Sequence, residues 1–296
     1  MRQARREWWN SLGKQVFRLT GVMVIVVLMA ILGMLLWNTA AFFLEISPVD
    51  FITGTQWDPS SSDAQYGILP LLVSTCLVTL GAMIIAIPIG IGTAAFLSEY
   101  AGSRLRNILK PIIEMLAAIP SVTIGFLGIV FLGPEIAQMT GQSNGLNALN
   151  GAILLAIMAL PTIVTIAEDA IQGVPQSYKE ASYGVGANRW ETLTKITIPA
   201  AAPGILAAVM LGVGRAIGET MTVLMATGNV SAFPKGFFHS VKTITATIAI
   251  EMGEVPYQTT HYYALFAIAT VLFAMTLVVN LIGEHFVNKF RKYQAA

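Results

Sequence analysis

The sequence predicts an all-α integral membrane protein with six transmembrane helices. Of its 296 residues, 55% are hydrophobic and only 11% are charged, and the mean hydropathy is +0.69. A soluble domain would carry about 25% charged residues. Six apolar runs have roughly the 20-residue length that crosses the hydrocarbon core of a bilayer. Basic residues gather in alternate loops between these runs, as expected for a chain that crosses a membrane back and forth.

The six apolar runs follow one another along most of the chain. The first, Leu19–Leu44, is too long for a cleaved signal peptide. The others are Ile68–Ser98, Met115–Gly133, Gly151–Ala167, Pro203–Thr227 and Tyr262–Gly283. Because proline removes a helical hydrogen bond, we expect Pro88 to kink the second run, Pro120 to break the third and Pro161 to break the fourth.

Lys and Arg residues set the predicted orientation. Fourteen of the 17 lie before the first run, between the second and third, between the fourth and fifth, or after the sixth, while the opposite loops hold only Lys235 and Lys242. Because cytoplasmic loops carry an excess of basic residues, both termini are expected in the cytoplasm. Residues 1–18 would then be cytoplasmic or interfacial, residues 19–65 the first helix and an outer loop, and residues 289–296 a cytoplasmic tail.

Several kinds of chemistry find no support in the residues. No Walker A, HExxH or GxSxG pattern occurs, so we expect no enzymatic hydrolysis of a nucleotide or a peptide by this chain. The single cysteine, Cys76, allows no disulfide within the chain, and no group of Cys or His residues suggests a metal site. The net charge of +1 gives no basic face for nucleic acid.

The loop between the fourth and fifth runs, residues 174–199, predicts a hairpin of two short helices. Pro175 suits the first turn of a helix, good helix formers follow it, and Gly186 permits a tight turn. A second helix over Asn188–Ile196 is expected to end before Pro199. The residues by themselves also fit an ordinary amphipathic loop that lies against the membrane.

The fifth run carries two formal charges, Arg215 and Glu219, one predicted helical turn apart. Each charge inside a membrane costs about 2.5–3.5 kcal/mol, so both side chains should face the protein interior or water. One interpretation is a structural ion pair, which on a helix surface contributes only about 0.2–0.5 kcal/mol. The other is a polar site on a substrate path. The planar Arg fork suits a tetrahedral oxyanion, and a carboxylate could accept a hydrogen bond from a protonated phosphate but not from sulfate.

The hairpin resembles the EAA motif of ABC importer permeases, EAA-x3-G-x9-I-x-LP, with serine for the second alanine and isoleucine for the leucine. The matching residues are Glu180, Ala181, Ser182, Gly186, Ile196 and Pro199. In that family the hairpin is the coupling helix, which docks in a groove of the ATPase subunit. The resemblance therefore implies that ATP and Mg²⁺ bind to partner subunits and that this chain binds no cofactor of its own.

Three further stretches resemble the permeases of phosphate-specific ABC importers: "MLGVGRAIGETMTV" (Met210–Val223), "AAIPSVTIGFLGI" (Ala117–Ile129) and the second run from Ile68 to Tyr100. The glycine-rich stretch is nearer to the PstC-type than to the PstA-type subunit. The resemblance implies a MetI-like permease core over residues 66–288, with one added N-terminal helix. It also implies a substrate path at Arg215, Glu219, Thr220 and Ser121.

The resemblance also implies partners and a location. It predicts a second, PstA-like permease subunit, two PstB-like ATPase subunits and an external PstS-like phosphate-binding protein, assembled in the lipid of a prokaryotic inner membrane and importing inorganic phosphate by alternating access. Two alternatives stay open: a permease for molybdate, sulfate or an organic solute, and a membrane sensor or scaffold that does not transport. The outer segment Thr243–Glu254 predicts an amphipathic helix, which either packs on its own domain or contacts the external protein.

Overall fold

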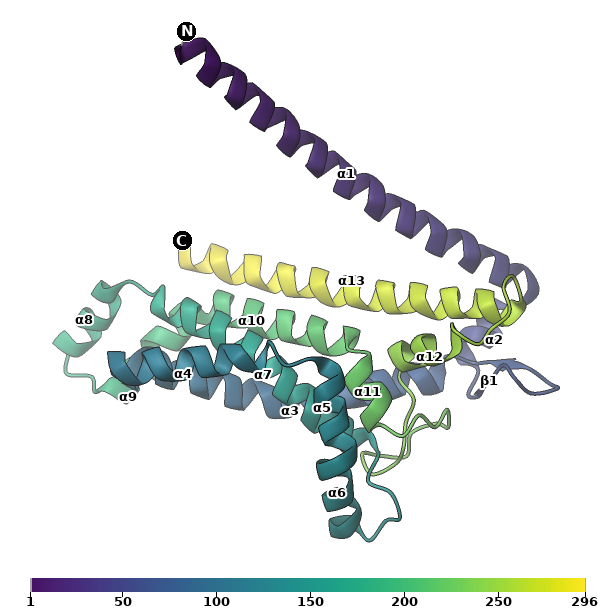
Figure 1. Cartoon of the computed structure of the whole chain (residues 1–296). Helices are drawn as coiled ribbons and strands as arrows, with labels where there is room; N and C mark the ends of the chain where they lie inside the picture. Colours follow the sequence, from purple (N-terminus) through teal and green to yellow (C-terminus); the bar gives the residue numbers. More distant parts are fainter. Residues whose placement is uncertain (1, 296) are drawn as a thin grey trace.

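Six helical segments of the computed structural model are long and apolar enough to cross a membrane, which confirms the predicted number. The structure describes the backbone of residues 2–295 and the side chains of residues 13–289. The candidate spans are Gly13–Glu45, Leu69–Tyr100, Ser121–Thr140, Ala148–Gln172, Arg189–Gly218 and Thr260–Lys289. Four of them contain one long helix each and lie roughly along one axis in Figure 1: α3 (Leu69–Ala95), α7 (Ala148–Gln172), α10 (Ile198–Gly218) and α13 (Thr260–Ala295).

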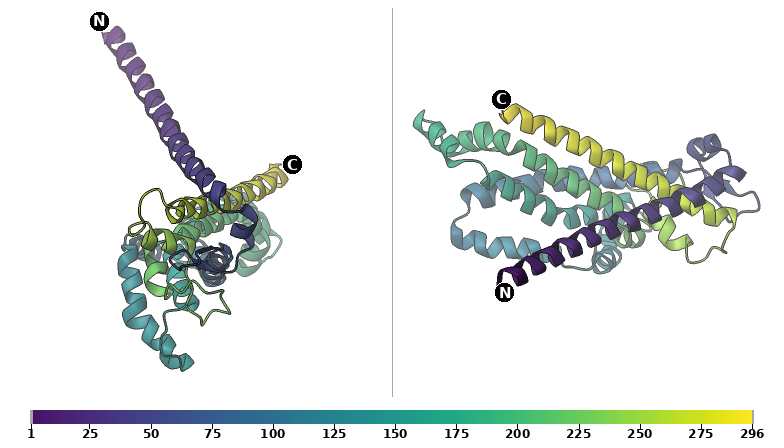
Figure 2. Two further views of the ribbon diagram at one scale, coloured as in Figure 1. Left: turned by 90° about the vertical axis from the view of Figure 1, so that its right-hand side faces the viewer. Right: turned by 90° about the horizontal axis from the view of Figure 1, so that it is seen from above.

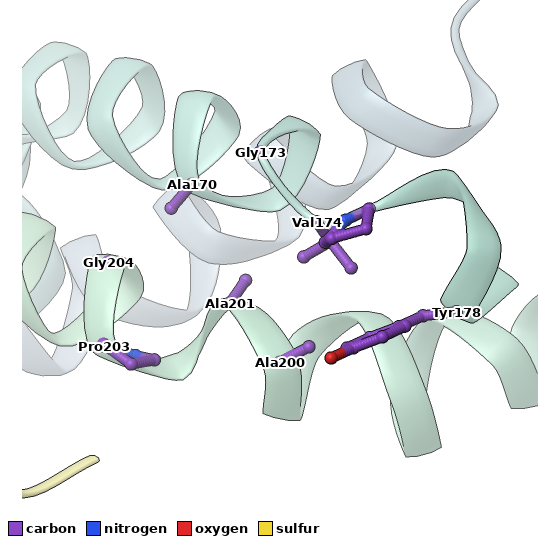
Figure 3. A pocket seen from close by; sticks show the side chains of 9 residues that line it. Ala170, Gly173, Val174, Tyr178, Ala200, Ala201, Pro203 and Gly204 are labelled. Carbon is purple, nitrogen blue, oxygen red and sulfur yellow. The ribbon is translucent and has the colours of Figure 1, made fainter. Parts of the chain in front are cut away.

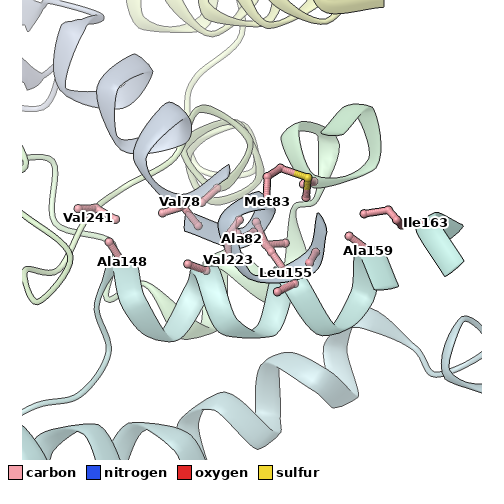
Figure 4. Close-up of a cluster of buried hydrophobic side chains, with 14 residues drawn as sticks. Val78, Ala82, Met83, Ala148, Leu155, Ala159, Ile163, Val223 and Val241 are labelled. Atoms are coloured by element: carbon pink, nitrogen blue, oxygen red, sulfur yellow. The ribbon is translucent and has the colours of Figure 1, made fainter. Parts of the chain in front are cut away.

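Helix α7 is the centre of the bundle, between α3 and α10. Its Ile163 fills the space left by two glycines, because a Cβ built on Gly90 of α3 or on Gly212 of α10 would lie 2.7 Å from an Ile163 side-chain carbon. Alanines cover much of the remaining contact, as Figure 4 shows around Ala82, Ala148 and Ala159. Small residues let transmembrane helices approach closely. Van der Waals packing then stabilises the bundle in lipid, where the hydrophobic effect does not drive helices together.

Two of the three prolines expected to disturb their helices leave them continuous. Helix α7 runs through Pro161 without the predicted break, and α3 runs through Pro88. Pro161 is buried among neighbouring helices, and such surroundings can satisfy the carbonyl that a proline leaves free. Pro120 does break its helix: α4 (Ser103–Leu116) ends before it and α5 (Ser121–Leu127) begins after it.

The fifth span differs from the prediction at both ends. It ends at Gly218 rather than at Thr227, and a separate short helix, α11 (Met221–Ala226), follows. At its start the helix does not stop before Pro199. Helix α9 (Arg189–Thr192) continues through a π-helical turn, η3 (Leu193–Thr197), into α10. The extra residue of a π turn changes the local hydrogen bonding just where the proline ring would otherwise clash with the preceding turn.

The third span also contains a π-helical turn. After α5 the chain passes through η2 (Gly128–Leu132) into α6 (Gly133–Thr140). Helix α6 points away from the bundle axis in Figure 1. Another π turn, η1 (Phe96–Tyr100), ends the second span, so three of the six spans depart locally from α geometry. The sequence patterns contain no signal for these turns.

The end of the molecule drawn at the right of Figure 1 is built from short elements. They are α2 (Pro48–Thr53), the antiparallel pair β1 (Trp57–Asp58) and β2 (Gln65–Tyr66), and α12 (Ile244–Glu251). Side chains from these elements share one core with α1 (Arg2–Glu45) and α13: Phe42, Phe51, Trp57, Ile68, Ile244, Leu265 and Ile268. Ile248 and Met252 pack against that core, so α12 does cover its own domain.

Charges at this same end are mostly acidic. Glu251 lies at its centre, with its carboxylate 2.5 Å from Lys242 Nζ and 2.8 Å from His261 Nε2, and it accepts a 3.2 Å hydrogen bond from Trp57 Nε1. The exposed carboxylates around it are Glu45, Asp50, Asp58, Asp63 and Glu254. Lys242 is committed to Glu251, which leaves Lys235 as the exposed lysine of the loops here.

Helix α1 joins the bundle only near its C-terminal end. Thr39 and Thr270 of α13 share a 2.7 Å hydrogen bond between their hydroxyls, and Phe42 is fully buried. Toward the N-terminus the helix diverges from α13, as both Figure 1 and Figure 2 show. Its apolar side chains from Val16 to Met34 are largely exposed, as expected for a helix surrounded by lipid.

Candidate functional site

Arg215 lies on the last turn of α10, and its guanidinium reaches the middle of the bundle. Its Nη1 donates a 3.2 Å hydrogen bond to the hydroxyl of Thr162, the fifteenth of the 25 residues of α7. No carboxylate among the described side chains forms an ion pair with it; the predicted partner Glu219 interacts elsewhere. The structure therefore places a cation, with a neutral hydrogen-bond partner, halfway along the central helix.

Glu219 is where helical geometry stops. Its φ of −69° is still helical but its ψ of 132° is extended, so α10 ends here and the chain turns away after this residue. Its Oε1 instead accepts a 3.3 Å hydrogen bond from the backbone N–H of Thr222, and its own carbonyl accepts one of 2.8 Å from the Thr245 hydroxyl. The structural ion pair that the sequence left open does not form among the described side chains, because the Glu219 carboxylate bonds to the first turn of α11 instead.

Ser121 meets this break from the third span. It is the first residue of α5, just after the break at Pro120, and its carbonyl accepts a 3.1 Å hydrogen bond from the Thr222 hydroxyl. The structure thus brings together the ends of two interrupted helices. Thr220 lies in the α10–α11 break with its side chain half-buried, and its hydroxyl contacts only the nearby Gly218 carbonyl, at 3.4 Å.

One face of α7 contacts both Thr222, at the helix break, and Arg215. The sulfur of Met158 lies 3.0 Å from the Thr222 hydroxyl, and Thr162, one turn further along α7, holds Arg215. Residues four apart on a helix share a face and are separated by about one 5.4 Å turn. The break with Ser121 and the guanidinium of Arg215 therefore lie within about one turn of each other along α7.

The predicted hairpin is present at the opposite end of the bundle from β1 and α12 (Figure 1). Helix α8 (Gln176–Gly184) and helix α9 are joined by a turn in which Gly186 has a φ of +89°. Asn188 and Glu191 cap α9 reciprocally, each side chain accepting a hydrogen bond from the other's backbone N–H. The left-handed backbone at Gly186 explains why the turn needs glycine there.

The residues that match the EAA motif occupy two environments. Glu180, Ala181, Gly186 and Pro199 are exposed, and Ile196 is half-buried. Ser182 is buried, and its hydroxyl shares a 2.9 Å hydrogen bond with the Thr192 hydroxyl of α9, so it holds the two arms together. A shallow hollow of about 310 Å³ opens between the arms, lined in part by Ser182, Gly186 and Ile196.

A second hollow, of about 530 Å³, lies behind the hairpin. Figure 3 shows it between the end of α7, the first turn of α8 and the start of α10, with the Tyr178 ring across from Ala200. Apart from Tyr178 and Val174 its walls are small residues or proline: Ala170, Gly173, Pro175, Ala200, Ala201, Pro203 and Gly204. The hollow therefore opens between the first turn of α8 and the start of α10, beside an apolar core that includes Val174 and Ala201.

Two contacts fasten the hairpin to the end of the second span, and the sequence did not reveal either of them. Lys179 Nζ of α8 lies 2.5 Å from Glu99 Oε1 of η1, and both side chains are largely buried. The guanidinium of Arg189, in α9, lies 5.0 Å from the ring centroid of Tyr100, also in η1. Opposite charges in two separate loops were visible in the sequence, but not their pairing.

A fully buried carboxylate nearby was also missed. Glu168 of α7 has ion pairs of 2.8 Å with Arg106 Nε and 2.6 Å with Lys110 Nζ of α4, and it accepts a short hydrogen bond from Gln172. The hydrogen bond to Glu168 raises the pKa of Lys110 above its usual 10.5, although burial works against it. Glu168 thus ties α4 to α7.

Comparison with known proteins decides the family. A family model described as "Binding-protein-dependent transport system inner membrane component" matches residues 86–292, more than two thirds of the chain. The chain belongs to this family. As an inner membrane component it is a multi-pass protein, and the predicted all-α fold with a MetI-like permease core is confirmed.

Named relatives cover most of this inner membrane component. It is 39% identical to the probable ABC transporter permease protein YqgH of Bacillus subtilis over 80% of this chain and 77% of the relative. It is 32% identical to the phosphate transport system permease protein PstC of Haemophilus influenzae over 96% and 95% of the two chains. PstC 1 of Mycobacterium tuberculosis is 31% identical, with 83% of each chain covered.

Solved structures agree on the fold. A subunit of a bacterial alginate ABC transporter superposes with a TM-score of 0.63 at 14% identity, covering 93% of this chain and 94% of its own. A subunit of the MetNI methionine ABC transporter, in an inward-facing conformation, gives a TM-score of 0.59 at 18% identity over 74% and 94%. At these identities the likeness concerns the architecture alone.

Proposed function

We propose that this chain is a transmembrane permease subunit of an ABC-type importer of inorganic phosphate. The observation that carries the proposal is Arg215: a cation held at mid-bundle by a neutral hydroxyl, with no carboxylate partner among the described side chains. Such a charge is stabilised when an anion binds, and the guanidinium fork matches two oxygens of a phosphate. Relatives named as phosphate transport permeases, at 31–33% identity, support the choice of anion.

The substrate path would pass the break between α10 and α11. Arg215 would bind phosphate oxygens there, with the hydroxyls of Ser121 and Thr220 as neutral donors from the two broken helices. Glu219 has an acceptor oxygen at the same break and could accept the O–H that phosphate keeps near neutral pH and sulfate lacks. Interrupted helices are a common way to place polar groups inside a membrane, because irregular backbone is tolerated where it lines a path.

The excess of basic residues in alternate loops supports an orientation with both termini in the cytoplasm of a prokaryotic cell. The α8–α9 hairpin then faces the cytoplasm and docks on an ATPase subunit, which binds the ATP and Mg²⁺. Its tip supports a protein partner: Val185, which lines the hollow around Gly186, is 87% exposed, and Trp190 of α9 is 64% exposed. Apolar side chains left open to water at a hairpin tip mark a contact surface.

A second permease subunit would cover the α4–α5 face. The backbone between Leu116 and Ser121 is not helical, and Ala117, Ala118 and Pro120 are exposed. The N–H groups of Ala117, Ala118 and Ile119 are bonded within the turn, but non-helical backbone at membrane depth is tolerated chiefly where it is buried in protein or lines a path. A similar permease, packed here, would enclose the break and complete a path shared by the two subunits. Two ATPases and an external phosphate-binding protein complete the proposed assembly.

Alternating access would follow from these parts. The external protein delivers phosphate to the outward-open path, and ATP binding draws the two ATPases together. Each hairpin moves with its ATPase, so that the path closes on the outside and opens inward past Arg215. This chain itself would make and break no covalent bond.

The test is ATP-dependent uptake of [32P]phosphate into vesicles that hold the full complex, comparing wild type with Arg215→Gln and recording assembly and ATP hydrolysis. Uptake should fall by about 10² or more, because an interaction with a charged group in a dry site contributes about 3 kcal/mol. Unlabelled sulfate, molybdate and an organic solute are added as competitors. Lys235→Gln, which removes an exposed lysine of an outer loop, is the matched control and should transport normally.

Four results would count against the proposal. Unchanged uptake by Arg215→Gln would remove Arg215 from the path, and failed assembly of that variant would make it a structural residue. Competition by sulfate or molybdate as strong as by phosphate would assign a different anion. A wild-type complex that hydrolyses ATP without moving any of the solutes would favour a sensor or scaffold.

A further inference from the structure

The hairpin is a stiff unit. The Ser182 and Thr192 hydroxyls join α8 to α9 at 2.9 Å, and the reciprocal caps between Asn188 and Glu191 fix the start of α9. Gly186 closes the turn with left-handed backbone. A push applied at the tip therefore displaces both arms together rather than bending one against the other.

The chain offers this unit two kinds of attachment. The covalent ones lead to α7, through residues 173–175, and to α10, through η3. At the first of these, a hollow of about 530 Å³ lies between the start of α8 and the start of α10 (Figure 3).

The non-covalent attachments are an apolar core, in which Val174 and Leu193 pack with Ala94 and Ala95 of α3, and the polar contacts with η1, which hold both arms. The 2.5 Å pair between Lys179 and Glu99 leaves 12% and 10% of the two side chains exposed, so solvent screens it little. Arg189 lies over the Tyr100 ring on the other arm. Glu99 and Tyr100 are adjacent residues at the end of the second span, so one short segment grips the hairpin at two points.

We infer that η1 is a clamp through which hairpin motion is transmitted directly to α3, with Glu99, Lys179, Tyr100 and Arg189 as positioning residues. This inference rests on the proposed function, since it assumes that an ATPase moves the hairpin. Helix α3 packs closely on α7 through Gly90 and Ile163. Motion delivered to α3 through the clamp therefore reaches the central helix at its mid-length, beside the level of Thr162 and Arg215, as well as along the chain from α8.

The first test compares phosphate moved per ATP hydrolysed in vesicles holding the full complex. Glu99→Gln and Lys179→Met should assemble and hydrolyse ATP, but the ratio should fall roughly fivefold, within the range expected for a change in coupling. The exchange variant Glu99→Lys with Lys179→Glu restores the ion pair with its charges reversed and should recover most of the ratio. Recovery would show that coupling needs the pair itself rather than either side chain alone. Glu284→Gln, an exposed carboxylate on α13, is the control and should match wild type.

The second test does not depend on the substrate or on the stability of the single variants. In a Cys76→Ser background, Glu99→Cys and Lys179→Cys are joined by a short bis-maleimide in the resting complex and in a vanadate-trapped complex. If the clamp stays closed through the cycle, the cross-linking yield is the same in both states and the linked protein still hydrolyses ATP.

The inference is overturned if Glu99→Gln couples as wild type, if the exchange variant is no better than the single ones, or if cross-linking drops on trapping with vanadate. Failure of the wild-type complex to import phosphate would refute the proposed substrate instead. The cross-linking result would still decide whether the hairpin and η1 move together.

Discussion

The guanidinium of Arg215 lies inside an apolar bundle and donates a hydrogen bond to the Thr162 hydroxyl. A neutral hydroxyl supplies one acceptor, while the guanidinium carries five N–H donors, so most of its hydrogen-bonding capacity is left for a ligand or water. The sequence located this charge and left two interpretations open, a pair with Glu219 or a site on a substrate path. The pair does not form, because the Glu219 carboxylate accepts a hydrogen bond from the Thr222 N–H just beyond the end of α10.

Glu168 makes the sharpest prediction about stability at the scale of a single residue. Glu168→Gln leaves Arg106 and Lys110 without their buried carboxylate, and breaking a buried pair costs about 3–5 kcal/mol. We expect a clear fall in the thermal unfolding temperature of the detergent-solubilised complex. Asp169→Asn is the control, because Asp169 pairs with the same Lys110 but is 63% exposed, and exposed pairs contribute about 0–1 kcal/mol. Equal losses in the two variants would contradict the role given to burial.

At the scale of elements, apolar length predicted each span, but the interruptions depended on tertiary contacts. Pro120 marked a real break, whereas Pro161 lies inside an unbroken helix because its neighbours surround it. The break at Glu219 is held by the hydroxyl of Thr245, 26 residues further along the chain. The π turns likewise have no periodicity that a sequence pattern reports. Local propensity predicted the structure correctly where contacts within the segment itself determine its conformation, as in the α8–α9 hairpin.

A substitution at Gly186 tests whether the α8–α9 hairpin needs its left-handed turn. Gly186→Ala forces a side chain into left-handed backbone, which costs about 1–2 kcal/mol. We expect fewer assembled complexes or lower stimulated ATP hydrolysis. Gly184→Ala is closely matched: both positions have open space for a Cβ, but Gly184 has an ordinary helical φ. The measurement is co-purification with the ATPase subunit followed by its activity. An equal effect at Gly184 would show that the turn conformation is not the cause.

At the scale of the whole molecule, the bundle has differently organised ends. At the hairpin end, ion pairs tie α4, α7, α8 and η1 together; at the other end, Glu251 alone ties Trp57, Lys242 and His261. Burial by itself would raise the pKa of Glu251, but the hydrogen bonds from His261 and Lys242 outweigh it and leave that pKa below its usual 4.5. The six-span plan followed from composition, whereas this convergence of three segments on one carboxylate did not.

The lowered pKa of Glu251 sets the direction in which stability changes with pH. A carboxyl whose pKa is depressed on folding contributes stability above its unfolded value, and that stability is lost as the pH falls through the folded value. The loops around α12 should therefore stay protected from hydrogen exchange down to about pH 4.5 and lose protection below it. Glu251→Gln should show weaker protection at neutral pH and little further change in acid. Protection that falls in parallel in both proteins would assign the effect to other groups.

The acidic end described above has a kinetic consequence for any free anion. Five exposed carboxylates and one exposed lysine give that end a negative potential, which slows the diffusional encounter of an anion instead of steering it inward. The repulsion is strongest in dilute salt and fades as ions screen it over about 10 Å. An anion presented inside a carrier, with its charge already neutralised, would cross this zone without the penalty. The surface thus disfavours capture from bulk solution and favours hand-over between two proteins in contact.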